Sequence, residues 1–361
     1  MSQAILVVFA AAIGGIVGSF LNACIYRMPR GIPLSNPRRS FCPACHRAIP
    51  WHENVPVLSW FLLRGKCSAC GAKISFRYPL VELLTASLFV LVWTRFGIPL
   101  APVYWALMAL LIVATFIDIE HFLIPDEITL GGTAAGLFLS VLFPQMMQAA
   151  SRIESFCFSL AAAGFGFGLL WLIVEIGKLA FGNKRHRFEK EEPFAVRPDG
   201  DAVTLQIGEE VLCWEDIFAR ESDELILECA SASIAGETPV LRFRHDRMIV
   251  ADQETPLGEL KAITGTLRAV VIPREAMGFG DVKLIAAIGA FLGWKAVLFT
   301  VAAASIIGCA AAFAGILLAR DTSGARVPFG PFLALGAILW IFGAETLWNA
   351  YFGIFTDGNA F

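Results

Sequence analysis

The sequence contains little charge. Asp, Glu, Lys and Arg make up 16% of its 361 residues, whereas about a quarter is usual in a soluble domain. Several long stretches carry no charged residue at all, among them residues 4–26. A membrane-spanning helix needs about 20 mostly apolar residues. The composition therefore excludes an ordinary soluble protein and predicts a polytopic membrane protein.

Further absences exclude other classes of protein. No basic segment precedes the apolar run at 4–26, so this run is expected to be an uncleaved anchor and not a signal peptide. The sequence GFGD at 278–281 lacks the Lys-Ser/Thr ending of a P-loop and the third glycine of a dinucleotide-binding fingerprint. We find no internal repeat of the kind that many transporters contain.

Apolar segments predict eight membrane spans, at residues 4–26, 79–98, 100–118, 127–146, 156–181, 281–293, 295–319 and 328–352. Residues 27–79, which follow the first span, carry nine Lys and Arg against one acid, Glu53. Short basic loops stay on the cytoplasmic side of a membrane. We therefore expect the N-terminus outside and this loop in the cytoplasm.

The predicted fold class is an all-α polytopic integral membrane protein with about eight transmembrane helices and two soluble parts. The expected domains are a first transmembrane helix at 1–26, a cytoplasmic zinc-binding domain at 27–79, transmembrane helices two to five at 80–182, an acidic cytoplasmic insert at 183–265 and the last three helices at 266–361.

The insert is expected to be rich in β-strand. Polar and apolar residues alternate at 202–207, 241–250 and 264–272, which is typical of strands with one buried face. Residues 183–262 hold 18 acidic against 10 basic side chains. The insert and the basic loop thus have opposite charge, and contact between them is a hypothesis; deleting 183–262 tests it.

Four of the nine cysteines form two C-x-x-C pairs, Cys42 with Cys45 and Cys67 with Cys70. This spacing is typical of two knuckles that close a tetrahedral zinc site. Disulfides are disfavoured in the reducing cytoplasm, and a redox motif would need only one pair. A loop of about 50 residues also builds little hydrophobic core, so a metal would stabilise it.

Two aspartates stand at the ends of apolar segments. Asp118 ends one run and Asp281 begins another, and the predicted topology puts both at the cytoplasmic face. Acids within spans are candidates for function. Two neighbouring carboxylates do not both ionise easily, so one keeps a proton while the other acts as a base. This arrangement is typical of an aspartyl protease, although Asp126 is an alternative to Asp118 and a helix cap is an alternative role for Asp281.

Small and charged residues surround Asp281. Gly278 and Gly280 would let a substrate backbone come close to this carboxylate. Lys283 either reaches the lipid headgroups or tunes the carboxylate pair. Glu120 and His121 are expected to be polar residues at the membrane interface.

These motifs together resemble a known family. GFGD resembles the GxGD signature of membrane-embedded aspartyl proteases. The wider set is similar to the bacterial type IV prepilin peptidases, which are leader peptidases and N-methyltransferases. The similar stretches are the two cysteine pairs, the region from Asp118 to Asp126, and residues 18–30, 54–86, 275–284 and 327–337.

The resemblance implies an enzyme of the bacterial inner membrane that cuts the basic leader from type IV prepilins or pseudopilins after a glycine. It also implies methylation of the new N-terminus with S-adenosylmethionine, a step associated with the cysteine loop. Within this family pattern, the catalytic aspartates correspond to Asp118 and Asp281. The zinc ligands correspond to Cys42, Cys45, Cys67 and Cys70.

Glu82 is a weaker candidate, for the methylation step, and packing is its alternative role. Rival functions are a peptidase without methylation, a transporter that uses the same intramembrane acids, and a zinc-dependent scaffold. We expect contact with membrane lipid and no nucleic-acid partner, and leave homo-oligomerisation open.

Overall fold

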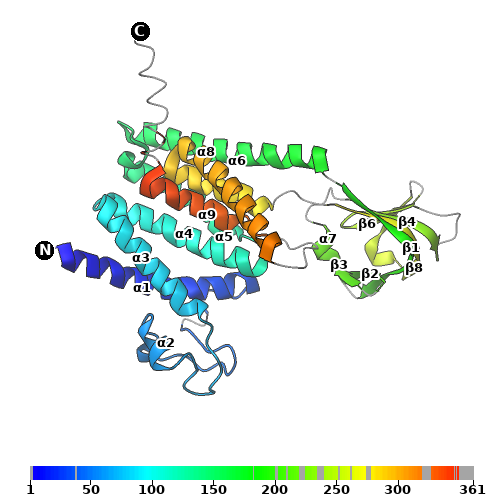
Figure 1. The fold of residues 1–361 in the computed structure, drawn as a ribbon, viewed down its shortest axis with the longest axis horizontal. Coiled ribbons are helices and arrows are strands. Elements are labelled where there is room, and N and C mark those ends of the chain that lie inside the picture. Colours follow the sequence, from blue (N-terminus) through cyan, green and yellow to red (C-terminus); the bar gives the residue numbers. More distant parts are fainter. Residues whose placement is uncertain are drawn as a thin grey trace, which may run out of the picture. The chain divides into compact units, whose positions relative to one another are not determined.

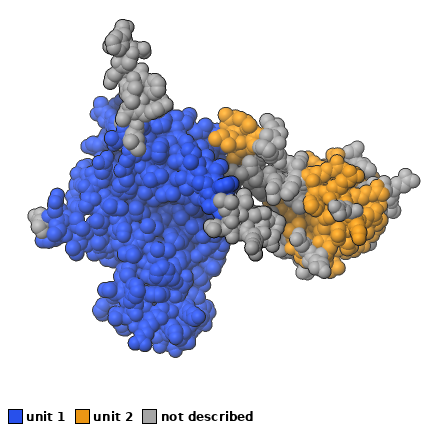
Figure 2. Space-filling view, in the orientation of Figure 1, with its two compact units in different colours: residues 1–171, 278–361 blue, residues 172–277 orange. Residues whose placement is uncertain are grey.

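The computed structural model describes residues 3–36, 39–181, 183–199, 202–208, 210–218, 224–233, 240–250, 253–260, 262–273, 278–318, 327–344, 346 and 348. The chain divides into two compact units, which Figure 2 colours separately. One consists of Met1–Trp171 and Gly278–Phe361, and we call it the helical unit. The other, Leu172–Met277, is called the insert unit.

Apolar helices form most of the structure outside the insert (Figure 1). They are α1 (Gln3–Arg27), α3 (Arg77–Phe96), α4 (Leu100–His121), α5 (Asp126–Leu142), α6 (Arg152–Phe181), α8 (Phe279–Leu318) and α9 (Gly330–Leu339), the last continued by a π-helical turn, Trp340–Ala344. Helix α3 packs against α1 and α4, while α8 packs against α5 and α9.

Within the described residues, five helices are long and apolar enough to cross a membrane: α1, α3, α4, α6 and α8. This finding agrees with a multi-pass protein but does not confirm eight spans. Helix α5 has 17 residues, and the apolar helix Gly330–Ala344 is also shorter than a full span. The predicted sixth and seventh spans lie together in α8, which Gly293 interrupts with a non-helical φ of 80° and ψ of 172°. Part of the predicted last span lies outside the described residues.

Glycines bring α1 close to α3. A Cβ atom on Gly14 would lie 2.6 Å from the Cα of Ala86, and one on Gly18 would lie 2.7 Å from the Cα of Glu82. Small residues spaced four apart let two helix backbones approach in this way. The consequence is that Glu82 lies directly beside α1.

Between α1 and α3, the described residues 28–36 and 39–76 form a loop with only short regular elements. They are the 3₁₀ turns Met28–Arg30 and Trp51–Glu53, helix α2 (Leu58–Leu62), and two isolated β-bridges, Phe41 to Ala48 and Lys66 to Lys73. Each bridge encloses one of the C-x-x-C pairs. We call this segment the cysteine loop.

The insert unit is built on one antiparallel sheet of eight strands, in the order β3-β2-β1-β8-β4-β5-β6-β7 (Figure 1). The strands are β1 (Asn183–Asp199), β2 (Ala202–Ile207), β3 (Glu210–Cys213), β4 (Leu225–Ala232), β5 (Val240–Phe243), β6 (Arg247–Val250), β7 (Gln253–Pro256) and β8 (Ile263–Pro273). A short helix, α7 (Trp214–Ile217), packs on β2 and β3.

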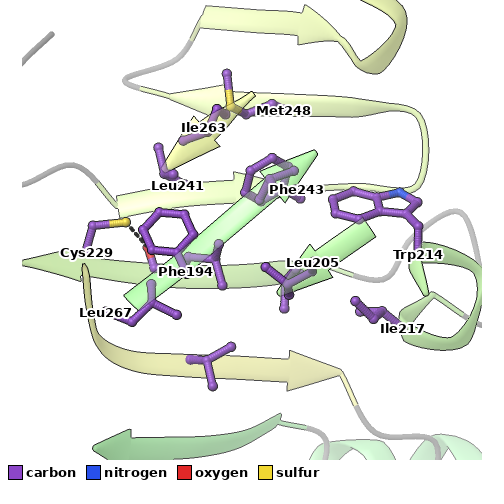
Figure 3. Packing of buried hydrophobic residues seen from close by; sticks show 14 of the residues in the cluster. Phe194, Leu205, Trp214, Ile217, Cys229, Leu241, Phe243, Met248, Ile263 and Leu267 are labelled. Atoms are coloured by element: carbon purple, nitrogen blue, oxygen red, sulfur yellow. Dashed lines mark hydrogen bonds between the residues drawn. The ribbon is translucent and has the colours of Figure 1, made fainter. Parts of the chain in front are cut away.

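The sheet buries its own hydrophobic core. Leu205, Leu241 and Phe243 are fully buried, and Phe194 and Trp214 pack with them (Figure 3). The three alternating sequences predicted as strands form β2, the β5–β6 hairpin and β8. The expectation of a β-rich insert is therefore confirmed, and the description as all-α holds only for the helical unit. The first residue of β1 pairs with the last of β8, Asn183 with Pro273.

Candidate functional site

Asp118 and Asp281 come from two helix ends. Asp118 lies in the last turn of α4 and Asp281 in the first turn of α8, and the side chain of each residue is buried, at 6% relative exposure. Ile124 lies beside both helix ends: a Cβ atom on Gly280, which precedes Asp281, would lie 3.1 Å from its Cβ, and one on Gly330, whose amide binds Asp118, would lie 3.0 Å from its Cδ1. Residues 163 positions apart in the sequence thus share one site (281 − 118).

The backbone of a third helix holds Asp118. Its Oδ2 accepts a hydrogen bond of 2.9 Å from the amide N–H of Gly330, at the start of α9. A Cβ atom on Gly330 would lie only 2.7 Å from this oxygen and 3.0 Å from Cδ1 of Ile124. Glycine is therefore required here by space. In the sequence, the only pointer to this contact is that Gly330 belongs to the stretch 327–337, which resembles the family.

Asp281 has a different environment. Its amide donates to the carbonyl of Gly278 at 3.1 Å. Its carboxylate Oδ1 is buried and has no hydrogen-bond partner among the residues that the structure describes. Gly278 lies beside the carboxylate, because a Cβ atom on Gly278 would lie 3.6 Å from Oδ2. A Cβ atom on Gly280 would instead lie 3.1 Å from Cβ of Ile124. Gly280 thus makes room for the chain between α4 and α5.

Lys283 pairs with Asp126. Its Nζ lies 2.6 Å from Oδ1 of Asp126 and 5.0 Å from the centre of the Phe279 ring. The Asp126 side chain is 59% exposed, unlike the buried pair formed by Asp118 and Asp281. Asp126, which the sequence offers as an alternative to Asp118, therefore lies outside the buried pair, and Lys283 has a protein partner.

The four predicted metal ligands lie together. The Sγ atoms of Cys42, Cys45, Cys67 and Cys70 are all within 4.8 Å of one another, and those of Cys42 and Cys70 are 3.9 Å apart. None of these four forms a disulfide. Tetrahedral zinc with Zn–S bonds of about 2.3 Å separates its sulfurs by about 3.8 Å. Four thiolates at this spacing fit zinc.

The two halves of this cluster have the same backbone. The amide of Cys42 donates to the carbonyl of Arg47 at 3.0 Å, and the amide of Cys67 donates to that of Ala72 at 2.8 Å. The residue after each second cysteine is left-handed, with φ of 56° at His46 and 71° at Gly71. The repeated turn points both thiols of each pair to the same side.

A cavity of about 440 Å³ lies between α1, the cysteine loop and α3. Glu82 lines it and is 9% exposed, and its Oε2 accepts a hydrogen bond of 2.7 Å from the amide of Val57. Glu120, at the end of α4, also lines it and pairs with Arg77 at 2.6 Å. The cavity therefore brings the weaker candidate Glu82 near the end of the helix that carries Asp118.

Comparison with known proteins gives consistent matches on both sides of the insert. Residues 12–96 match the Bacterial Peptidase A24 N-terminal domain, and residues 105–183 and 255–313 match the Type IV leader peptidase family. The interruption between 183 and 255 falls within the insert unit. No solved structure matches the chain.

Several curated relatives carry the name prepilin leader peptidase/N-methyltransferase. One from Myxococcus xanthus (strain DK1622) is 45% identical over 144 residues, 39% of this chain and 42% of the relative. One from Aeromonas hydrophila is 29% identical over 355 residues, 90% of this chain and 87% of the relative. One from Pseudomonas putida is 28% identical over 373 residues, 94% of this chain and 92% of the relative. The chain belongs to the type IV leader peptidase family.

Proposed function

We propose that this protein cleaves the basic leader from type IV prepilins or pseudopilins and then methylates the new N-terminus. The observation that carries the proposal is the pair of buried carboxylates, Asp118 and Asp281, at two helix ends of a leader-peptidase family member. Relatives that align over about nine tenths of the chain are named for both activities.

In the proposed cleavage step, one carboxylate is ionised and the other is protonated. The ionised group takes a proton from water as the water oxygen attacks the peptide carbonyl carbon, and the protonated group gives its proton to the carbonyl oxygen. Collapse of the tetrahedral intermediate breaks the C–N bond, and the leaving amine takes up a proton. The pair titrates jointly, so neither role is fixed to one residue.

The two carboxylates differ in their hydrogen bonds. The Gly330 amide holds one oxygen of Asp118 in place, which limits how far this carboxylate can turn. Oδ1 of Asp281 has no hydrogen-bond partner among the described residues and can accept one from water or substrate.

Methylation needs a methyl donor, which we propose is S-adenosylmethionine. This compound would supply an electrophilic methyl group on a sulfonium. The nitrogen of the new N-terminus bonds to the methyl carbon as the C–S bond breaks. The electron pair of the C–S bond goes to sulfur, and a proton leaves the nitrogen. The chain's own contribution is the cysteine loop. We propose that zinc stabilises the fold of this loop by binding Cys42, Cys45, Cys67 and Cys70.

We also propose a place in the bacterial inner membrane, with the N-terminus outside and both the cysteine loop and the insert in the cytoplasm. The support is the excess of Lys and Arg in residues 27–79. Leader cleavage would then take place at the cytoplasmic face.

Mass spectrometry of a prepilin co-produced with this protein tests the proposal. The wild type should release a pilin that lacks its leader and carries one added methyl group on its N-terminus. Asp118→Asn and Asp281→Asn should each leave the leader uncut, while Glu127→Gln, an exposed acid on α5, should behave as wild type. Retained cleavage in either aspartate variant would remove that residue from the pair.

A further inference from the structure

The cavity between α1, the cysteine loop and α3 has the properties of a binding site. Its volume of about 440 Å³ falls within the roughly 300–1,000 Å³ usual for small-molecule pockets. Aromatic side chains line it, including Tyr26, Trp60 and Tyr78. Pockets that combine aromatic walls with a few polar groups are typical of ligand sites.

Glu82 is a buried acid in the wall of this cavity, which also carries the basic side chains Arg27, Arg30, Lys73 and Arg77. Of the three acids in the cavity wall, Glu53 pairs with Arg47 and Glu120 pairs with Arg77. Glu82 forms no ion pair with any residue in the described part of the chain, although it is almost fully buried. A buried carboxylate without an ion-pair partner is unfavourable, so a cationic ligand would be stabilised beside it.

Asn22 supplies a second, independent observation. Its side chain is 2% exposed and lines the same cavity. Nδ2 donates to the carbonyl of Tyr78 at 3.0 Å, whereas the buried Oδ1 has no partner among the described residues. Leaving a buried acceptor unpaired is unfavourable. The wall of the cavity therefore contains an unpaired acceptor at Asn22.

From these contacts we infer that the cavity between α1, the cysteine loop and α3 binds the methyl donor, a cationic sulfonium compound with an aromatic base. Glu82 faces the positive charge, Asn22 accepts a hydrogen bond, and the aromatic side chains stack on the base. Aromatic faces and carboxylates both favour a cation. The inference rests on the proposed methylation activity, and it assigns the donor to a defined set of side chains.

The position of the cavity fits a reaction that follows cleavage. Glu120 lies in its wall and Asp118 lies two residues earlier on α4. An N-terminus released beside Asp118 therefore needs to move only around one helix end to reach the donor. The cysteine loop supplies part of the same wall, through Cys42 and Cys67.

Binding to the purified full-length protein, with its metal, tests the inference by calorimetry. The probes are S-adenosylmethionine and S-adenosylhomocysteine, which differ in the sulfonium charge. The wild type should bind the sulfonium compound more tightly. Glu82→Gln keeps an acceptor for the Val57 amide but removes the charge, so it should weaken S-adenosylmethionine binding roughly ten- to hundredfold and change S-adenosylhomocysteine binding much less. Glu127→Gln is the matched control.

Two further readouts separate binding from folding. Glu82→Gln should cleave prepilin and retain metal at wild-type levels, because neither the carboxylate pair nor the cysteines change. Ultraviolet cross-linking of radiolabelled S-adenosylmethionine to the wild type should label peptides that contain Tyr26, Trp60 or Tyr78. Labelling confined to other peptides would overturn the inference even if the Glu82 variant does not fold.

The outcomes distinguish this inference from the function on which it rests. If the wild type binds and transfers the methyl group while Glu82→Gln binds both compounds unchanged, the location is wrong and the methyltransferase activity stands. If the wild type binds neither compound and the pilin stays unmethylated, the methyltransferase activity fails and the inference fails with it.

Discussion

Lys283 and Asp126 form an ion pair of 2.6 Å between the first turns of α8 and α5. The chain between α4 and α5, residues 122–125, lies next to this pair, and its Ile124 packs against Gly280 and Gly330. The pair therefore joins the first turn of α8, which contains Asp281, to the segment that follows Asp118. We interpret Lys283 as a positioning residue for the two carboxylates.

Charge reversal tests this interpretation. Lys283→Asp should lower the rate of leader cleavage by up to about fivefold, because it breaks a pair worth up to about 1 kcal/mol and sets two acids side by side. The double variant with Asp126→Lys should recover part of that loss. Recovery stays partial since a cation is unfavourable at the start of α5. Cleavage of a fluorescent prepilin peptide gives the rates, and no recovery in the double variant would contradict a pairwise role.

Substitution of Gly330 tests the contact between α9 and Asp118. Gly330→Ala places a methyl group 2.7 Å from Oδ2 of Asp118, so the carboxylate or the helix must shift. A misplaced reacting group of this kind lowers a rate by roughly ten- to hundredfold. Gly315→Ala is the control, because no atom of the described residues lies within 4 Å of a Cβ atom placed there. Equal cleavage by both variants would show that the Asp118 contact is dispensable.

Metal removal tests the cysteine cluster. The purified protein should contain one zinc ion per chain by plasma emission spectrometry, and Cys67→Ser should lose it, because three thiolates bind zinc much less tightly than four. Loss of zinc should abolish methylation and leave leader cleavage intact, since Asp118 and Asp281 lie on α4 and α8 and not in the cysteine loop. Cys309→Ser changes an exposed cysteine of α8 and should retain both. Wild-type zinc content in Cys67→Ser would exclude this site.

The pH dependence of the insert unit follows from Cys229. Burial of its side chain in the sheet raises the pKa of this thiol from 9.0 to about 11. The folded insert thus holds the thiol proton more tightly than the unfolded chain does. Its contribution to stability is complete below about pH 9 and is lost as the pH rises through about 11. Urea unfolding followed by tryptophan fluorescence at pH 8 and pH 10.5 should show a drop that Cys229→Ala removes.

Local patterns in the sequence predicted much of the structure. Two short C-x-x-C turns are each complete within a few residues, and the structure brings all four thiols together as expected. Alternation over six residues was sufficient for β2, because one face of a strand in a sheet is buried. The family was also predictable, since its motifs are short and contiguous. The catalytic roles of Asp118 and Asp281 remain predictions.

Contacts between distant segments could not be predicted in the same way. The Gly330 amide and Asp118 are 212 residues apart, and Lys283 and Asp126 are 157 apart. Neither pair has a local signal, because any of several charges or amides could have met the same side chain. The number of spans was uncertain for a related reason: apolar composition is the same on both sides of Gly293, where one assigned helix, α8, contains a break.

The pairing of Asn183 with Pro273 has a consequence for how such a chain can grow. Neighbouring strands lie about 4.8 Å apart, so the polypeptide enters and leaves the eight-stranded sheet at almost the same point. A domain joined through two neighbouring strand ends can be inserted or lost with little change in the spacing of the chain segments on either side of it.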